Sequence, residues 1–410
     1  MIAILATAFL LRLVCAVGIQ RHLDQGSREV CLIPGDADGY WRLAGKITQG
    51  QDYAIYEPPR SVMRMPGFPL LLALPRFVFP ESLLAARVWL AAIGVSACWF
   101  TYLLGKGLVS GPAGLWGAAI TALSPVLAVF SVLILSETPF AAALTASLVL
   151  FVKLDRRLSL PIAPGERWSA VSVGLAIAVA TLMRPTWLLI APIVALGCLR
   201  RADFPRRFQA GLLVIAAAYG ALLPWGIRNA AVTGHFTLTT FWVGPSLYDG
   251  LNPDATGDSD MRFFDEENLL TRMSEYDMDR EYRRRAWQFA ADHPSRTLEL
   301  MAMKLWRYLS PWPNARQFQS PTVRLIVTIS FLALLLPALF GTWQLRQRPM
   351  VLAVTWGPLI YFAAVHVWFV GSIRYRLPAE YPLAVLSGAA LAAGFRIFTA
   401  PKQLAKAGDA

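Results

Sequence analysis

Apolar runs recur along the whole chain, and each is long enough to cross the hydrocarbon core of a bilayer as one helix, which needs roughly 17–25 residues. Hydrophobic residues make up 56% of the 410 residues and charged residues only 16%, whereas soluble domains carry about 25% charged residues. The period-two alternation of a transmembrane barrel is absent. The sequence therefore predicts an all-α integral membrane protein, a polytopic helical bundle.

The apolar runs predict about ten spans with both chain ends in the cytoplasm. Basic residues such as Arg156, Arg207 and Arg348 fall in the short connections of one side, as the positive-inside rule expects. This distribution accounts for the net charge of +12 without nucleic acid as a partner. The first run lacks the features of a cleaved signal peptide, so we interpret it as a retained span. The expected spans are 2–20, 83–104, 113–131, 138–153, 168–184, 186–199, 209–228, 321–343, 350–370 and 376–396.

Two segments on the other side of the membrane are too long to be simple connectors, and they divide the chain into three parts. Residues 1–228 form an N-terminal membrane module that contains the first outer loop, 21–82. Residues 229–320 form an extracytoplasmic, partly helical segment. Residues 321–410 form the C-terminal membrane helices and a short cytoplasmic tail.

Each of the two long outer segments contains a predicted amphipathic helix. In the first, the i, i+3, i+4, i+7 spacing indicates a helix lying in the membrane interface, with one face made of Tyr40, Leu43, Ala44 and Ile47. Asp38 is placed to cap this helix, and Asp36 stands just ahead of it. In the second, Pro294 marks a helix start, with Leu298, Met301, Ala302 and Leu305 expected on one face.

Acidic residues at the outer rim are the first candidates for chemistry. Asp36 and Asp38 are either solvated capping residues or carboxylates that act as a general base or bind an acceptor or cation. Glu137, in LSETPF between the third and fourth spans, is expected on the same side. It either begins a helix, where the helix dipole favours an acid, or completes a catalytic pair with Asp36.

Basic residues on the outer side are the second candidates, because they run against the charge bias of membrane proteins. A phosphate or pyrophosphate at the interface would explain them through charge-assisted hydrogen bonds, and the alternative is contact with lipid headgroups. The substrate-binding candidates are Asp38 and five basic residues, namely Arg64, Arg228, Lys304, Arg374 and Arg376.

Motifs for a resident cofactor are absent. The four histidines have no metal-ligand spacing, and the loop 252–260 has Phe263 where a calcium-binding EF-hand needs glutamate. No Walker loop, dinucleotide fingerprint or GxSxG elbow occurs. An enzyme of this kind therefore needs a donor that is already activated. We expect no metal-ligand set in the protein, although the chemistry allows a divalent cation such as Mg or Mn.

Several stretches, taken in order, resemble the dolichyl-phosphate-mannose–protein mannosyltransferase-like superfamily, the GT-C glycosyltransferases of family 39 type and their bacterial members. The resemblance covers nearly the whole chain. It is carried by GDADGYWRLAGKITQG, RMPGFPLLLAL, LSPVLAVFSVLILSETPF, LMRPTWLLIAP, PWGIRNAAVTGHF with GLNPDATG, and SIRYRLPAEYPLAVLSGAALA.

The resemblance implies a GT-C fold, a polyprenyl-phosphate sugar as donor and inverting transfer to a lipid, glycan or protein acceptor. The family places an essential acid in the first outer loop as Asp-Glu shortly before an aromatic residue. Asp36 matches the first position, whereas Ala37 departs from the second and Asp38 is displaced by one. Glu137 matches the second acidic position.

The family's basic positions are matched as well. Arg64 matches the arginine of the R-x-P-G turn, and Arg228, Arg374 and Arg376 fall where relatives carry basic residues for the donor phosphate. The sequence thus predicts a multi-pass glycosyltransferase of the inner (plasma) membrane with an extracytoplasmic active site and Asp36 as base. The alternative is a transporter or flippase of a lipid-linked saccharide, which favours inverted repeats that this sequence does not show.

Overall fold

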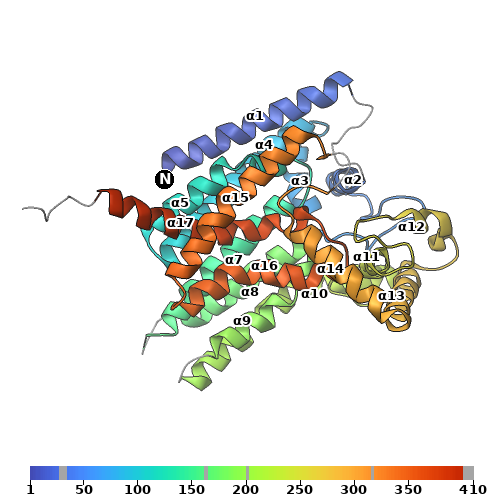
Figure 1. Cartoon of the computed structure of the whole chain (residues 1–410). Coiled ribbons are helices and arrows are strands. Elements are labelled where there is room, and N and C mark those ends of the chain that lie inside the picture. The colour runs from blue at the N-terminus through green and yellow to red at the C-terminus, as the bar shows by residue number, and fades with distance from the viewer. Residues whose placement is uncertain (27–34, 161–164, 200–202, 315–317, 400–410) are drawn as a thin grey trace, which may run out of the picture.

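A computed structural model describes the chain except for residues 27–34, 161–164, 200–202, 315–317 and 400–410. Within the described ranges the regular elements are helices, apart from one isolated bridge between Ile55 and Arg60. Long helices form a bundle, and a group of shorter helices within residues 243–309, α11 to α14, lies at one end of it (Figure 1). The predicted all-α membrane fold is confirmed.

In the described part of the chain, seven helices are long and apolar enough to cross a membrane. They are α1 (Ile2–Gly26), α4 (Leu83–Leu108), α7 (Glu137–Arg157), α8 (Glu166–Met183), α10 (Phe204–Thr233), α15 (Pro321–Gln344) and α16 (Pro349–His366). The remaining expected spans correspond to α5 (Gly111–Leu123) with α6 (Pro125–Phe130), to η1 (Pro185–Trp187) with α9 (Ile190–Cys198), and to α17 (Leu377–Thr399).

Serine and proline break one expected span, 113–131, into α5 and α6. Ser124 adopts an extended backbone, ends α5 and caps α6 by accepting a hydrogen bond from the Leu127 amide. Pro125 then begins α6, since proline suits the first position of a helix and cannot continue one. The chain is therefore helical on both sides of Ser124, as predicted, but as two short helices.

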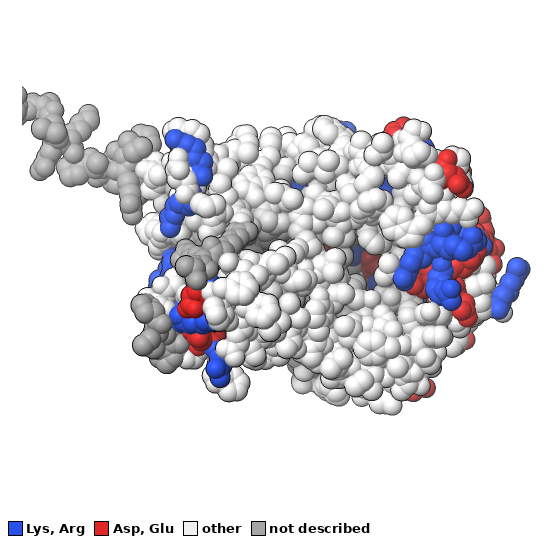
Figure 2. Space-filling view, turned by 90° about the horizontal axis from the view of Figure 1, so that it is seen from below, with Lys and Arg blue, Asp and Glu red and all other residues white. Residues whose placement is uncertain are grey.

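Charge is distributed over the surface as expected of a membrane protein. Lysine, arginine, aspartate and glutamate gather at the two ends of the molecule, and an uncharged belt separates them (Figure 2). Large apolar side chains such as Leu10 and Val14 of α1 and Leu325 and Ile329 of α15 are exposed in the structure. Their exposure is stable only in an apolar solvent, so the chain is a multi-pass membrane protein.

The interfacial helix predicted in the first outer loop is α2 (Asp36–Thr48). It packs against α3 (Gly67–Val78), where Arg76 donates to the Trp41 carbonyl at 2.6 Å and lies over the Trp41 ring. The predicted capping by Asp38 is wrong. The helix begins at Asp36, after Gly35 with φ 84°, so Asp38 already lies in its first turn and pairs with Arg42 at 2.9 Å.

The long second outer segment contains α11 (Val243–Gly250), α12 (Arg262–Glu267), η2 (Leu269–Thr271), α13 (Glu275–Asp292) and α14 (Pro294–Leu309). Helix α14 starts at Pro294 as predicted, and Leu298, Met301, Ala302 and Leu305 share one of its faces, but a different face is the buried one. Thr297, Leu300, Lys304 and Tyr308 are buried, whereas Leu298 is 67% exposed. In a membrane protein an apolar stripe need not face the protein, because lipid is as apolar as a core.

Candidate active site

Asp36 and Glu137 each stand at the first position of a helix, α2 and α7 respectively. Helix N-termini carry partial positive charge and favour an acidic side chain there. The Asp36 side chain is 36% exposed, whereas that of Glu137 is 1% exposed. The two carboxylates thus differ in access: Asp36 is open to a small molecule and Glu137 is enclosed.

Arg374, in η4 (Ile373–Tyr375), joins the two carboxylates. Its Nη1 lies 2.8 Å from Asp36 Oδ2, and its Nε donates to Glu137 Oε1. Arg64 extends the chain of ion pairs on one side, with Nη2 at 2.9 Å from Asp36 Oδ1, and Arg184 on the other, with Nη1 at 2.6 Å from Glu137 Oε1. We call these five residues the carboxylate–arginine chain. Three arginines and two carboxylates leave one net positive charge.

The ion pairs decide the protonation of Asp36. Burial disfavours its charged form, but the neighbouring Arg374 and Arg64 outweigh burial and hold the pKa of the carboxyl well below its ordinary value. Burial acts against the charged form of Arg374 too, and Glu137 and Asp36 together raise the pKa of its guanidinium. Both groups are therefore ionised at neutral pH.

Aromatic rings support the outer two arginines of the chain. The Arg64 guanidinium lies 4.5 Å from the centre of the Tyr40 ring, and that of Arg184 lies 5.4 Å from the centre of the Tyr375 ring. Tyr375 in turn stacks on His366, with ring centres 4.1 Å apart. Cation–π contacts of this kind orient a guanidinium without using its N–H donors, so donors stay available for an anion.

Local sequence explains how the arginines reach the site. Gly39 leaves room for Arg64, because a Cβ there would lie 3.0 Å from Arg64 Nε. Gly67 allows the turn after Arg64 to approach α8, since a Cβ would lie 2.6 Å from the Leu182 carbonyl oxygen. Arg184 precedes Pro185, which pushes it to extended backbone and ends α8 there.

Arg228 fastens the loop that carries Arg64. Its Nη1 donates to the Ser61 carbonyl at 2.7 Å and its Nη2 to the Tyr53 carbonyl at 3.1 Å. The Tyr53 hydroxyl donates to the Arg64 carbonyl at 3.3 Å. The structure therefore places Arg228 among backbone carbonyls of the loop rather than in the carboxylate–arginine chain.

Lys304 and Arg376 fasten the segments on either side of Arg374. Lys304 is fully buried, and its Nζ donates to the carbonyls of Val367 and Trp368 at 3.2 Å each. Burial lowers the pKa of this ammonium to about 8. Arg376 is also buried; it pairs with Glu380 at 2.8 Å and donates to the Ser310 carbonyl at 2.8 Å. Both cations are occupied by the protein itself.

The structure thus brings together four of the residues singled out from the sequence, namely Asp36, Glu137, Arg64 and Arg374. Asp38, Arg228, Lys304 and Arg376 lie apart from this chain of ion pairs. Sequence reasoning missed Arg184. The signal that could have found it is its place at the outer end of an expected span, directly before a proline, since a cation on that side runs against the charge bias.

A divalent cation does not fit the site as it stands. Asp36 and Glu137 are the only carboxylates of the carboxylate–arginine chain, and guanidinium groups bind both. Among the described residues no group of three or more histidine, cysteine, aspartate or glutamate side chains is arranged to hold a metal ion. A metal at this place would have to displace Arg374.

A cavity of about 720 Å³ lies beside α2 and the loop that follows it. Its lining is rich in hydrogen-bonding side chains, among them Arg42, Lys46, Gln49 and Glu57. Tyr56 belongs to the same lining, and its hydroxyl donates to the Gly35 carbonyl at 3.3 Å. Because Gly35 directly precedes Asp36, one side chain connects the wall of the cavity to the carboxylate–arginine chain.

No protein-family model matches this sequence, and no curated protein matches it. Solved structures do match. The archaeal oligosaccharyltransferase AglB from Archaeoglobus fulgidus, in complex with an inhibitory peptide and a dolichol-phosphate, superposes with a TM-score of 0.61 and 16% identity over 97% of this chain and 51% of that chain. The same oligosaccharyltransferase, tethered to an acceptor peptide containing the NVT sequon, gives 0.62 and 15%, over 97% and 50%.

ArnT from Cupriavidus metallidurans bound to undecaprenyl phosphate gives a TM-score of 0.44 and 12% identity, over 96% of this chain and 77% of that chain. The chain spans about half the length of the oligosaccharyltransferase. At these identities the likeness concerns the fold, and the narrower resemblance to the family 39 type stays a prediction. Over nearly its whole length, the chain has the GT-C fold expected from its sequence.

Proposed function

We propose that this chain is a membrane glycosyltransferase that moves a sugar from a polyprenyl-phosphate donor to an acceptor at the extracytoplasmic face. The carboxylate–arginine chain carries the proposal. Its single net positive charge suits the single negative charge of a phosphodiester, and arginine binds phosphate oxygens in bidentate geometry. The positive connections at the opposite end of the bundle support an outward-facing site.

Donor binding would exchange the partners of Asp36. The phosphate oxygens compete with the Asp36 carboxylate for Arg64 and Arg374, whose N–H groups bind Asp36 in the free protein. Once these cations turn to the phosphate, the pKa of Asp36 rises toward its ordinary value and the carboxylate becomes a stronger base. The resting ion pairs thus hold Asp36 ionised until the donor arrives.

The transfer step balances with the residues present. The acceptor oxygen or nitrogen attacks the anomeric carbon, the bond from that carbon to the phosphate oxygen breaks with inversion, and Asp36 takes the acceptor proton. The polyprenyl phosphate leaves with one more negative charge, which Arg64 and Arg374 stabilise. We assign the base to Asp36 because it is the exposed carboxylate, and we assign Glu137 the positioning of Arg374 and Arg184.

The cavity beside α2 is the best place for the polar part of the acceptor, because its lining offers both donors and acceptors of hydrogen bonds. A lipid, a glycan or a protein could present that part. Structures of the oligosaccharyltransferase contain a dolichol-phosphate or a tethered acceptor peptide. They support a lipid-linked donor and a separate acceptor for this chain too. For the location we propose the inner membrane. For the organisation of the chain we propose the three parts expected from the sequence, residues 1–228, 229–320 and 321–410.

The test uses purified protein in liposomes with a panel of polyprenyl-phosphate sugars. The wild type should transfer the sugar or slowly hydrolyse the donor, and Asp36→Asn should lower the rate by about 100-fold or more. Asp292→Asn is the matched control, because Asp292 is an exposed carboxylate at the end of α13 that does not line the cavity beside α2, and it should keep the wild-type rate. Movement of intact donor across the bilayer, unchanged in Asp36→Asn, would instead favour the transporter or flippase.

A further inference from the structure

A second cavity, of about 310 Å³, lies at the opposite end of the bundle from the candidate active site. Helix α7 runs from the candidate active site to this cavity. It begins at Glu137, and Asp155 and Arg156 near its end line the cavity. At 1.5 Å per residue this stretch is about 30 Å long, which matches the hydrocarbon thickness of a bilayer. The cavity therefore lies near the headgroups of the other leaflet.

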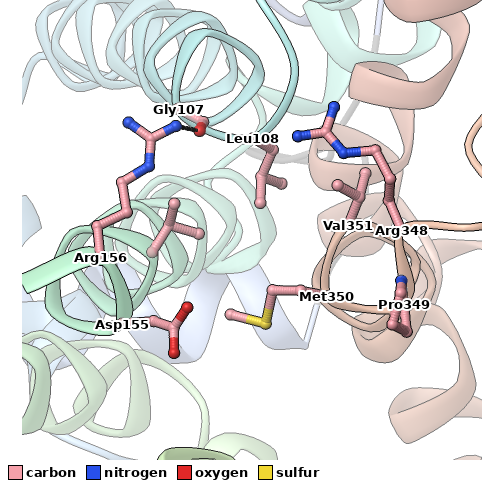
Figure 3. A pocket seen from close by; sticks show the side chains of 9 residues that line it. Gly107, Leu108, Asp155, Arg156, Arg348, Pro349, Met350 and Val351 are labelled. Atoms are coloured by element: carbon pink, nitrogen blue, oxygen red, sulfur yellow. Dashed lines mark hydrogen bonds between the residues drawn. The ribbon is translucent and has the colours of Figure 1, made fainter. Parts of the chain in front are cut away.

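The floor of this cavity is apolar. Leu108 of α4, Val152 of α7 and Val351 of α16 line it, and all three belong to the largest buried cluster of the protein. Met350 packs against the same cluster and extends between α16 and α7 (Figure 3). A ligand in the cavity would therefore contact apolar side chains at its floor.

The rim of the cavity is cationic. Figure 3 shows the guanidinium groups of Arg156 and Arg348 on opposite sides of the opening, with Leu108 between them. Arg156 donates to the Gly107 carbonyl, and the exposed Arg348 side chain makes no hydrogen bond or ion pair with the described residues. Asp155 is the only acid of the lining, and it lies 3.5 Å from the buried Arg207. The positive charge of the rim is thus not neutralised from within.

We propose that this cavity binds the phosphate headgroup of an anionic phospholipid. Two guanidinium groups at interfacial depth supply charge-assisted hydrogen bonds to the phosphate, and the apolar floor takes the adjoining part of an acyl chain. A soluble phosphate would use the cations alone and would leave the floor in contact with water. The lipid joins the start of α16 to the ends of α4 and α7.

The test uses the full-length protein in phosphatidylcholine nanodiscs that contain phosphatidylglycerol with a photoreactive acyl chain. In the wild type, crosslinking to the peptide with Met350 and Val351 is expected. Arg156→Gln combined with Arg348→Gln should lower this crosslinking at least tenfold. The charge-matched control combines Lys153→Gln with Arg346→Gln, two exposed cations that do not line the cavity, and should keep the wild-type yield.

Two further arms use the wild type alone, so they decide the proposal even if a variant fails to fold. Photoreactive phosphatidylcholine, which has no net charge, should label the same peptide at least tenfold less. Inorganic phosphate should not displace phosphatidylglycerol. Equal labelling by both lipids, displacement by phosphate, or equal loss in both double variants would overturn the proposal. Sugar transfer is not measured, so these results are independent of the proposed function.

Discussion

Asp36 and Glu137, at the N-termini of α2 and α7, bind the same guanidinium group, that of Arg374. The shared counter-ion ties two separate connections of the chain to a third, the turn η4 between α16 and α17. Any ligand that takes Arg374 from Asp36 alters the surroundings of both carboxylates. This relationship underlies the predictions that follow.

Arg374→Lys should lower sugar transfer by about 100-fold. A lysine has one charged nitrogen and cannot reproduce the planar fork that binds Asp36 and Glu137 together, and one charged hydrogen bond contributes about 1.5–3 kcal/mol. Rate measurement with a saturating acceptor checks this. Arg167→Lys, which changes an exposed arginine in the first turn of α8 that lines neither cavity, is the control and should keep the wild-type rate. A fully active Arg374→Lys would contradict the bridging role.

Glu137→Gln should destabilise the protein by about 3 kcal/mol, because it leaves Arg184 and Arg374 without their buried counter-charge. Arg184→Met should also destabilise it, while the double variant should lose clearly less than the sum of the two. Thermal unfolding of the wild type, the two single variants and the double variant completes this double-mutant cycle and gives the interaction energy of the pair. Additive shifts in the unfolding temperature would show that Glu137 and Arg184 do not interact.

Lys304 gives a prediction for alkaline pH. Its pKa is lowered from 10.5 to about 8 in the folded chain, so between these values the unfolded chain holds more protons. Stability from this group therefore rises with pH across that window, by about 3 kcal/mol in all, and is unaffected well below pH 8. Lys304→Met lacks the group. The unfolding free energy of the wild type should rise relative to that of Lys304→Met from pH 8 to pH 10; parallel curves would be evidence against the buried ammonium.

Removal of divalent metal ions should leave transfer within about twofold of its starting rate, since guanidinium groups bind both carboxylates and stabilise the leaving phosphate. The measurement is the transfer rate after EDTA treatment, compared with the same sample after Mg or Mn is restored. A rate that collapses with EDTA and returns with metal would show that a cation replaces Arg374 during the reaction.

The sequence was most informative where spacing and charge act locally. The spacing from Tyr40 to Ile47 predicted α2, and the acids and arginines of the outer connections named four members of the site before their contacts were known. The first inference rests on a spacing pattern within a few residues, and the second on the side of the membrane to which each connection is assigned. Both can be derived from the sequence directly.

Tertiary contacts decided the rest. The capping role of Asp38 was wrong because α2 already begins at Asp36, after Gly35. The spacing of apolar residues in α14 also did not reveal that Lys304 is buried against carbonyls of a distant segment. The same holds for Arg228, whose partners lie in the first outer loop. No local pattern states which carbonyl or carboxylate a long cationic side chain will reach.

The position of a bound lipid phosphate tests the central claim most directly. A cryo-EM structure of the full chain with a polyprenyl phosphate should place the phosphate within hydrogen-bond distance of Arg64 and Arg374, with the ion pair between Arg374 and Asp36 opened. A phosphate bound elsewhere, with both ion pairs of Asp36 intact, would contradict the account.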